Sequence, residues 1–258
     1  MILNHPKGPT SPGELVIPEE WTIHPDGVPY VIGDFMLSRT PRASAEKVLI
    51  FSHTRNLRWL SECRVVAGDR TFAMRFPPQS EWRQLYIIHG YVRGTFIPLV
   101  GIASNSTTGR MYASSLTYLK DNMREVIGLD WRPAVFLSDF EAAVISALPH
   151  VFTHDGFKHK GCWFHFSQAI LKRVKSLGLQ KDYSKDMELR VFIDKLRFMA
   201  LVPFFSIARC LTTLIDGRNR EVTALMTKYP ALHQLVYDYY LPTWIGANHR
   251  APVFSPSL

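Results

Sequence analysis

The 258-residue sequence predicts an α/β protein in which a mixed sheet is flanked by helices and followed by a helical extension. Three observations lead to this fold class. Three runs rich in β-forming residues follow one another between residues 64 and 103. Helical and strand-like segments then alternate as far as residue 177. From residue 187 to 240 the spacing of apolar residues is helical throughout.

The composition is that of an ordinary globular protein, with 47% hydrophobic and 20% charged residues, which excludes a mostly disordered chain. The net charge of +8 favours polyanions as partners but says nothing about the fold. Cys63, Cys162 and Cys210 are too few and too scattered for a disulfide framework, and they fit a reducing compartment.

We expect neither secretion nor a membrane span. The first 15 residues lack the apolar segment of a secretory signal. The longest apolar stretch, residues 198–215, contains Arg209 and is interrupted by Pro203, so it predicts buried helices.

The N-terminal part divides into an arm and the start of a core. Residues 1–43 are expected to be an extended arm, because residues 1–30 hold six of the 17 prolines and show little periodicity. Residues 44–63 predict a strand or short helix followed by an amphipathic helix. The core is expected to span residues 44–246, with a tail at 247–258.

The α/β part covers residues 64–177. Strands are predicted at 64–69, 84–92 and 95–103. We expect them to be antiparallel, and Arg93-Gly94 is a tight-turn signal between the last two. The remaining elements are a helix at 110–127, a strand at 134–138, a helix at 140–147, a strand at 157–162 and a helix at 166–177.

The helical part covers residues 187–240. Helices are predicted at 187–200, 204–215, 219–228 and 231–240, separated by Pro203, Gly217 and Pro230. The apolar spacing leads us to expect five buried side chains in this part: Phe198, Leu201, Phe204, Phe205 and Leu211.

Two acids stand at the ends of predicted strands, Asp69 and Asp139, 70 residues apart. Each has a structural interpretation, because Asp139 precedes a helix that it could cap and Asp69 could start a turn. As a pair on adjacent parallel strands, their carboxylates would lie within about 4–8 Å and share divalent cations such as Mg²⁺. The pair is therefore a candidate two-metal site.

Several blocks then resemble one family. The segments GDRTFAMRFP (68–77), QLYIIHG (84–90) and residues 96–120 resemble the first acidic block of Mutator-like element (MULE) transposases. SDFEAAVISA (138–147), GCWFHFSQAI (161–170) and DYYLPTWIG (238–246) resemble its later blocks, in the same order. The ordered set spans about 180 residues and is a more specific signal than any single block.

The resemblance implies a ribonuclease-H-like fold with an Asp-Asp-Glu site that uses Mg²⁺ or Mn²⁺ to cleave and transfer DNA strands. It implies DNA as the partner, the nucleus as the location, and Asp69 and Asp139 as the first two acids. At the third acidic position this sequence has Leu241. Asp238 and Glu221 are nearby acids, but neither matches the motif.

Three functional hypotheses follow. The first is an active transposase core, and the second is a catalytically inactive, domesticated derivative that binds DNA or a protein. Leu241 favours the second. The third is an unrelated α/β phosphoesterase or nuclease, which would hydrolyse DNA that carries no element ends.

Cys162 and His165 have the spacing of half a zinc site. His150, His154 and His159 would have to complete it, and the spacing matches no standard zinc module. The alternative is that Cys162 and His165 only stabilise a strand-to-helix junction.

Basic residues are dense from 157 to 197, where ten Lys or Arg face four Asp or Glu. Lys158, Lys160, Lys172, Arg173 and Lys175 form the densest part. This stretch is either a surface that contacts DNA phosphates or a solvated helix face. Four aromatic residues near the end of the sequence are expected to lie in the core rather than to stack on bases: Tyr237, Tyr239, Tyr240 and Trp244. The sequence leaves assembly into homo-oligomers open.

Overall fold

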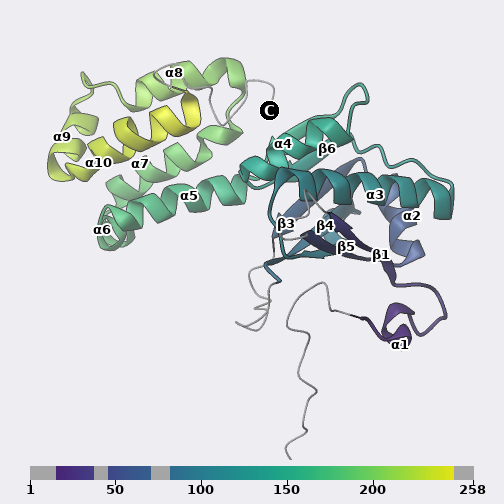
Figure 1. Ribbon diagram of the computed structural model, residues 1–258. Coiled ribbons are helices and arrows are strands. Elements are labelled where there is room, and N and C mark those ends of the chain that lie inside the picture. Colours follow the sequence, from purple (N-terminus) through teal and green to yellow (C-terminus); the bar gives the residue numbers. More distant parts are fainter. Residues whose placement is uncertain (1–15, 38–45, 71–81, 247–258) are drawn as a thin grey trace, which may run out of the picture. The chain divides into compact units, whose positions relative to one another are not determined.

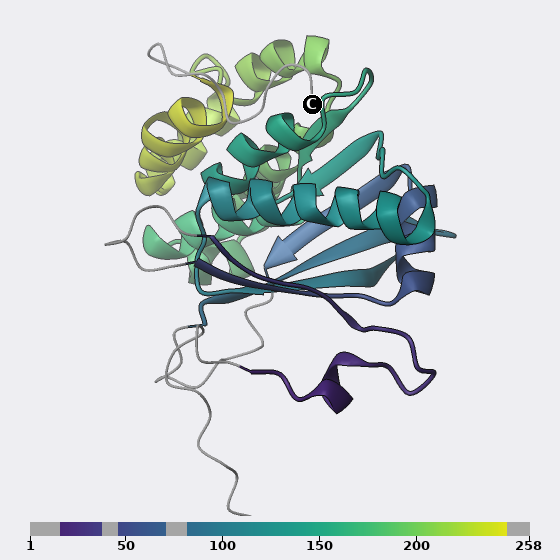
Figure 2. The same ribbon diagram turned by 45° about the vertical axis from the view of Figure 1, so that its right-hand side comes forward.

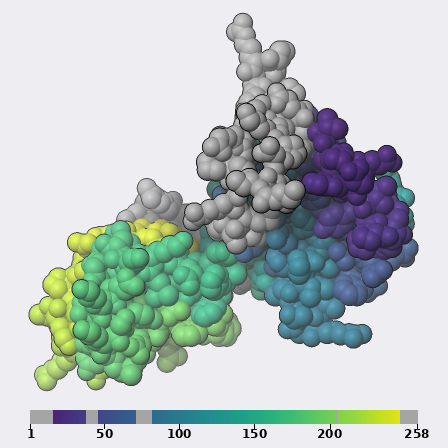
Figure 3. All heavy atoms as spheres, turned by 90° about the horizontal axis from the view of Figure 1, so that it is seen from below, coloured from purple at the N-terminus to yellow at the C-terminus, as the bar shows by residue number. Residues whose placement is uncertain are grey.

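The computed structural model describes residues 16–37, 46–70 and 82–246. The chain forms two compact units, Met1–Lys160 and Gly161–Leu258. Figure 1 labels their elements, and the space-filling view in Figure 3 colours the first unit purple to teal and the second green to yellow.

The first unit is an α/β structure built on a seven-stranded mixed sheet with the strand order β1-β2-β5-β4-β3-β6-β7. Its strands are β1 (Val31–Leu37), β2 (Glu46–Phe51), β3 (Val65–Arg70), β4 (Gln84–Val92), β5 (Thr95–Ser104), β6 (Val135–Ser138) and β7 (Lys158–Gly161). Its helices are α1 (Glu19–Thr22), α2 (Thr54–Glu62), α3 (Gly109–Ile127) and α4 (Ala142–Val151).

Strand directions follow the sequence prediction. The three strands β3, β4 and β5 pair antiparallel, as the sequence predicted, and the short turn Arg93-Gly94 joins β4 to β5. Strand β6 pairs parallel to β3 after the crossover through α3. Val31–Leu37, which the sequence assigned to an extended arm, instead forms β1 and pairs antiparallel with β2 at one edge of the sheet.

The helices α3 and α4 lie side by side over the sheet (Figures 1 and 2). Along β4, buried residues alternate with half-buried ones, so one face of this strand carries most of the core contacts. The core cluster includes the fully buried residues Trp131, Phe136, Ile50, Leu57 and Leu116.

The ends of α3 show why this helix could be recognised from the sequence. The side chain of Thr108 accepts a hydrogen bond from the backbone N–H of Met111, which satisfies one of the free donors of the first turn. The helix ends at Gly128, whose φ of 68° lies in the left-handed region that favours glycine.

Beyond Gly161, the last residue of β7, the described residues of the second unit form helices joined by turns and connections, as the sequence predicted for 187–240. Its elements are α5 (Trp163–Ser176), α6 (Gln180–Lys185), α7 (Met187–Phe198), the 3₁₀-helix η2 (Met199–Leu201), α8 (Phe204–Leu214), α9 (Arg220–Lys228), α10 (Ala231–His233) and the π-helix η3 (Gln234–Ile245). Its core includes Phe166, Ile170, Ile193, Leu196 and Val236.

The burial expected around Pro203 is mostly wrong. Phe198, Leu201 and Phe205 are 49%, 62% and 86% exposed, whereas Leu211 is buried as expected. The Phe204 side chain lies outside the described residues. The helical spacing of apolar residues identified the helices correctly. However, the 3₁₀-helix η2 and Pro203 redirect the chain between α7 and α8. The three exposed side chains therefore do not continue the buried stripe of α7.

None of the helices in the described ranges combines the length and apolar character that crossing a membrane requires.

Candidate active site

Asp69 and Asp139 lie at the same end of two paired strands. In the parallel pair β3–β6, Gly68 is opposite Ser138, and each aspartate is the next residue along its strand. Parallel strands bring their carboxyl ends to one edge of a sheet, so the parallel arrangement that the sequence analysis required is present. Both aspartates are half-buried. Two carboxylates thus stand at neighbouring positions in register.

Each of these acids also had a structural alternative to metal binding. Helix α4 begins at Ala142 and its N-cap residue is Glu141, so Asp139 does not occupy the cap position. Its Oδ1 instead accepts a hydrogen bond from the backbone N–H of Glu141 at 3.1 Å, which turns the chain between β6 and α4. Asp69 is the fifth residue of β3 and pairs with Ile87 of β4. It is therefore a strand residue rather than the start of a turn.

A tyrosine from β4 packs over the strand that carries Asp69. The Tyr86 side chain is buried, and a Cβ atom on residue 68 would overlap its hydroxyl group. Only glycine lets β3 approach the ring this closely. Burial, the nearby Tyr112 and then the carboxylates of Asp139 and Asp69 raise the pKa of Tyr86 well above its ordinary value. The phenol therefore stays neutral beside the acids.

A third carboxylate, Glu141, lies in the same cluster and was not identified from the sequence. Arg70 Nη2 donates to Glu141 Oε1 at 2.8 Å, and the Tyr112 hydroxyl lies 3.0 Å from Glu141 Oε2. These contacts connect β3, α3 and the start of α4. Because Arg70 and Glu141 are each about three-quarters buried, this ion pair is shielded from water. We interpret Glu141 as a clamp on the strand ends, since Arg70 neutralises its charge.

The tyrosine of this clamp is itself fixed by a second side chain. The Tyr112 hydroxyl lies 2.8 Å from Gln84 Oε1, and Gln84 Nε2 donates to the Ser106 carbonyl at 2.8 Å. Burial and the Glu141 carboxylate raise the pKa of Tyr112. The neutral hydroxyl can then donate a hydrogen bond at any physiological pH.

His159 of β7 contacts Ser138, the last residue of β6, next to Asp139. Its Nε2 lies 2.8 Å from Ser138 Oγ, and Ser138 Oγ donates to the Asp139 carbonyl at 2.7 Å. Since the serine has one hydroxyl proton, Nε2 must be the donor in the His159–Ser138 contact. Burial lowers the pKa of His159, while the Asp139 charge acts in the opposite direction. The imidazole is consequently neutral at pH 7 and braces the end of β6. His159 lies in the strand predicted at 157–162, and nothing in the sequence indicated that it would contact Ser138.

The candidate zinc ligands belong to the second unit. Cys162 is the N-cap residue of α5 without a side-chain cap, and His165 lies in the first turn of that helix. Both are half-buried. Within the described ranges they belong to no group of three or more ligand side chains close enough to hold one ion. Zinc binding by this pair stays a prediction.

The residues considered for the third acidic position also lie in the second unit. Leu241 is half-buried in the π-helix η3. Asp238, in the same helix, and Glu221, in the first turn of α9, are exposed. A π-helix of 12 residues is unusual, and π-turns within helices are frequent at functional sites.

The basic stretch is only partly free to contact a polyanion. Lys172 and Lys175 are exposed on α5, but Arg173 is half-buried with its guanidinium 5.6 Å from the centre of the Tyr239 ring. Tyr240 and Trp244 are buried, so the expected core role of these two aromatics is confirmed. Tyr237 is 37% exposed.

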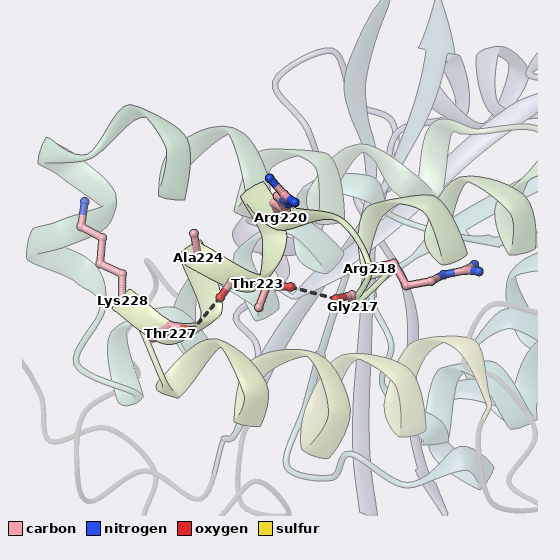
Figure 4. Close-up of a pocket in the computed structure, with 7 residues that line it drawn as sticks. All are labelled: Gly217, Arg218, Arg220, Thr223, Ala224, Thr227 and Lys228. Carbon is pink, nitrogen blue, oxygen red and sulfur yellow. Dashed lines mark hydrogen bonds between the residues drawn. The ribbon is translucent and has the colours of Figure 1, made fainter.

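A second basic surface lies along α9, where a hollow of about 680 Å³ is lined by Gly217, Arg218, Arg220, Thr223, Ala224, Thr227 and Lys228 (Figure 4). Two of its three cations are already paired. Arg218 contacts Asp216, and Lys228 Nζ lies 2.6 Å from Asp186 Oδ2. This hollow is therefore a weaker candidate for phosphate binding than Lys172 and Lys175.

Searches against protein-family models, curated proteins and solved structures found no match to this chain.

Proposed function

We propose that this chain is a divergent MULE-type DNA transposase core with a ribonuclease-H-like fold, and that Asp69 and Asp139 bind Mg²⁺ or Mn²⁺. The observation that carries the proposal is the register of β3 and β6, which places both motif aspartates next to each other at one sheet edge. The order of elements from β3 to α5 supports the fold, because it repeats the order predicted from the motif-bearing sequence: three strands, then helix, strand, helix, strand and helix.

The donor set fits a hard divalent cation. Mg²⁺ prefers carboxylate oxygens and retains several waters, so two half-buried aspartates are suitable ligands. Asp139 uses Oδ1 for the Glu141 N–H, which orients the carboxylate and leaves Oδ2 for another partner. When bound, such ions supply an activated attacking oxygen and stabilise the leaving oxygen in phosphodiester cleavage.

The surrounding residues would hold this site rather than react. The Arg70–Glu141 pair ties the end of β3 to the start of α4, and His159 braces Ser138 from β7. Tyr86 fills the space above Gly68 as a neutral group. Neighbours that are neutral or paired with one another thus surround the two aspartates.

A second candidate function is favoured by Leu241. An apolar side chain at the third acidic position of the resemblance removes one ligand, which lowers metal affinity and loosens its geometry. We therefore propose that the unaltered chain cleaves DNA weakly or not at all and retains DNA binding. In that case it is a domesticated, DNA-binding derivative of a transposase.

Strand nicking tests the proposed function most directly. The full chain is incubated with a supercoiled plasmid in Mg²⁺ or Mn²⁺, alongside Leu241→Glu and Leu241→Gln. Restoring a carboxylate should raise metal-dependent nicking, and the neutral isostere should not. The gain should disappear when Asp139→Asn is added to Leu241→Glu. Robust nicking by the unaltered chain that depends on Asp238 but not on residue 241 would show that the third ligand was assigned wrongly.

Metal binding tests the site independently of cleavage. Mn²⁺ binding followed by electron paramagnetic resonance should weaken in Asp69→Asn and Asp139→Asn. A crystal structure with Mn²⁺ should place the two carboxylates about 4–8 Å apart, as expected for a shared two-ion site. Mn²⁺ affinity that is unchanged in both variants would refute the assignment of these aspartates.

DNA binding is tested through its salt dependence. Affinity for a duplex should fall steeply with salt, because binding releases counterions from the phosphates. The double variant Lys172→Ala/Lys175→Ala should reduce the slope of log K against log salt by about 2, since each phosphate contact contributes about 0.9. Lys181→Ala/Lys185→Ala, on the neighbouring helix α6, is the matched control. Equal slopes for both double variants would remove α5 from the DNA-binding surface.

A further inference from the structure

Two histidines and an aspartate meet in the N-terminal part of the first unit, away from every motif of the transposase resemblance. His24 Nδ1 lies 2.8 Å from Asp26 Oδ1, and His53 Nε2 lies 2.9 Å from Asp26 Oδ2. One imidazole nitrogen thus faces each carboxylate oxygen. The three ligand atoms lie within 4.8 Å of one another. Because His53 is 27 residues from Asp26 in sequence, tertiary structure creates this arrangement.

The turn that carries His24 and Asp26 is held by backbone hydrogen bonds. The His24 N–H donates to the Val28 carbonyl at 2.8 Å, and the Gly27 N–H donates to the His24 carbonyl at 2.8 Å. Gly27 has a φ of 83°, a conformation that glycine adopts without strain. The Val28 N–H donates to Asp26 Oδ1 at 3.2 Å. Asp26 is therefore presented by a defined turn.

The turn is also connected to the sheet close to His53. The Tyr30 N–H donates to the Thr22 carbonyl, and the Ser52 N–H donates to the Tyr30 carbonyl at 2.9 Å. Ser52 directly precedes His53, whose side chain is only 12% exposed. The site thus has one nearly buried ligand on the sheet side and two more exposed ligands on the turn.

The charge state of the aspartate suits a cation. The Asp26 carboxylate faces both imidazoles and accepts a hydrogen bond from the Val28 N–H, so it offers a fixed negative charge to a cation. The Arg55 guanidinium repels a metal cation at this site, because its Nη2 lies 3.9 Å from Asp26 Oδ2. The Arg55 side chain is 71% exposed, however, and can move into solvent.

The tautomer of His53 defines what an ion must displace. His53 Nδ1 accepts a hydrogen bond from the backbone N–H of Arg55 at 3.0 Å, which caps helix α2. In the neutral ring the proton is then on Nε2, facing Asp26. An ion at Nε2 takes the place of this proton, and the ring proton moves to Nδ1. The Arg55 N–H then loses its acceptor, so binding is coupled to the first turn of α2.

We propose that His24, Asp26 and His53 form a binding site for a borderline transition-metal cation of the Zn²⁺ class. Two imidazole nitrogens and one carboxylate are the three-protein-ligand set that leaves a fourth position for water. Metal–ligand bonds of about 2.0–2.2 Å place tetrahedral ligand atoms about 3.3 Å apart. The nitrogen–oxygen separations of 2.8 and 2.9 Å join the imidazoles to different oxygens of Asp26. Binding must therefore widen these two by about half an ångström and shorten the longer separations, which are within 4.8 Å. Imidazole ligands also separate this site from the all-carboxylate pair Asp69–Asp139, which suits Mg²⁺.

Titration of the tag-free full chain with Co²⁺ and Zn²⁺ tests the proposal. Tetrahedral Co²⁺ with nitrogen ligands absorbs in the visible range, and Zn²⁺ should displace it with one ion per chain. Asp26→Asn and His24→Ala should each weaken binding on the order of 10-fold or more, because every ligand of a three-ligand site contributes. His53→Asn removes the imidazole but keeps a side-chain acceptor that can cap α2, so its loss of affinity is separable from misfolding.

Two further variants serve as controls. Arg55→Ala removes the repelling guanidinium and keeps the backbone donor, so the affinity should stay the same or rise. Asp69→Asn/Asp139→Asn leaves the three ligands intact, and Co²⁺ absorption should persist. The Arg55 amide should exchange faster with solvent when Zn²⁺ is bound, because its acceptor is lost. No visible Co²⁺ absorption, or binding unchanged in Asp26→Asn and His53→Asn, would overturn the proposal.

Discussion

The two units each contain a partly buried arginine–carboxylate pair that also contacts a tyrosine, yet the pairs differ in origin. In the first unit, Arg70 and Glu141 are 71 residues apart in sequence and join a strand to the start of a helix. In the second unit, Asp194 and Arg197 lie three residues apart on α7, where Tyr183 donates to Asp194 at 2.8 Å. The chemistry is the same, but one pair is non-local and the other is local.

The difference determines what each pair can do. The Arg197 pair fastens one helix to its neighbours, since Arg197 Nε also donates to Ser167 Oγ of α5 at 2.7 Å. The Arg70–Glu141 pair holds the end of β3, which carries Asp69, to the start of α4, which follows Asp139. The Arg197 pair therefore stabilises the packing of helices, whereas the Arg70 pair orders the residues around the candidate site.

The largest effect should come from the core beneath the site. Phe136 on β6 is fully buried, whereas Phe205 on α8 is 86% exposed. Phe136→Ala should destabilise the first unit by about 3–5 kcal/mol through loss of apolar contacts and a cavity. Phe205→Ala should change stability by at most about 0.5 kcal/mol. Denaturant unfolding measures both, and similar effects would contradict the contrast in burial.

Breaking the two ion pairs compares them directly. Glu141→Gln keeps the shape of the side chain but removes the carboxylate that Arg70 contacts at 2.8 Å, so we expect a loss of about 1–3 kcal/mol. Asp194→Asn should lose less, about 1 kcal/mol, because Arg197 keeps its contacts with Ser167 Oγ and the Tyr183 hydroxyl. Urea unfolding of single and double variants gives the coupling energy of each pair. A larger coupling for Asp194–Arg197 would reverse the proposed ranking.

The pH dependence of the first unit should report on His159. Because burial lowers its pKa in the folded state, His159 contributes stability above its unfolded pKa of 6.5, and this contribution is lost as the pH falls through the folded value. His159→Gln keeps a donor for Ser138 Oγ but does not titrate. The decrease in stability between pH 7 and pH 5 should therefore be smaller in His159→Gln than in the unaltered protein. Parallel pH profiles for the two proteins would show that His159 does not contribute.

The smallest effect is expected from Tyr86→Phe. The Tyr86 hydroxyl is buried and has no hydrogen-bond partner within the described ranges. Removing it eliminates a desolvated polar group, so stability should change by at most about 1 kcal/mol and could rise. Thermal unfolding with and without Mn²⁺ provides the measurement. A marked loss of stability confined to the Mn²⁺-bound protein would instead connect this hydroxyl to the metal site.

Local sequence signals determined most of the elements of this protein. The alternation of strands and helices from β3 to α5 follows from residue types and turn signals, and so does the helical character of 187–240. Asp69 and Asp139 could be selected because an acid directly after a buried apolar run is conspicuous in the sequence alone.

Only the tertiary structure determined what depends on contacts between distant residues. Strand pairing placed Val31–Leu37 in the sheet, aligned Gly68 with Ser138, and brought Arg70 to Glu141. It also decided that Phe205 points to solvent, and it gathered His24, Asp26 and His53. Periodicity reports on neighbours within a few residues along the chain, whereas packing depends on which faces meet in space, and no local pattern records that.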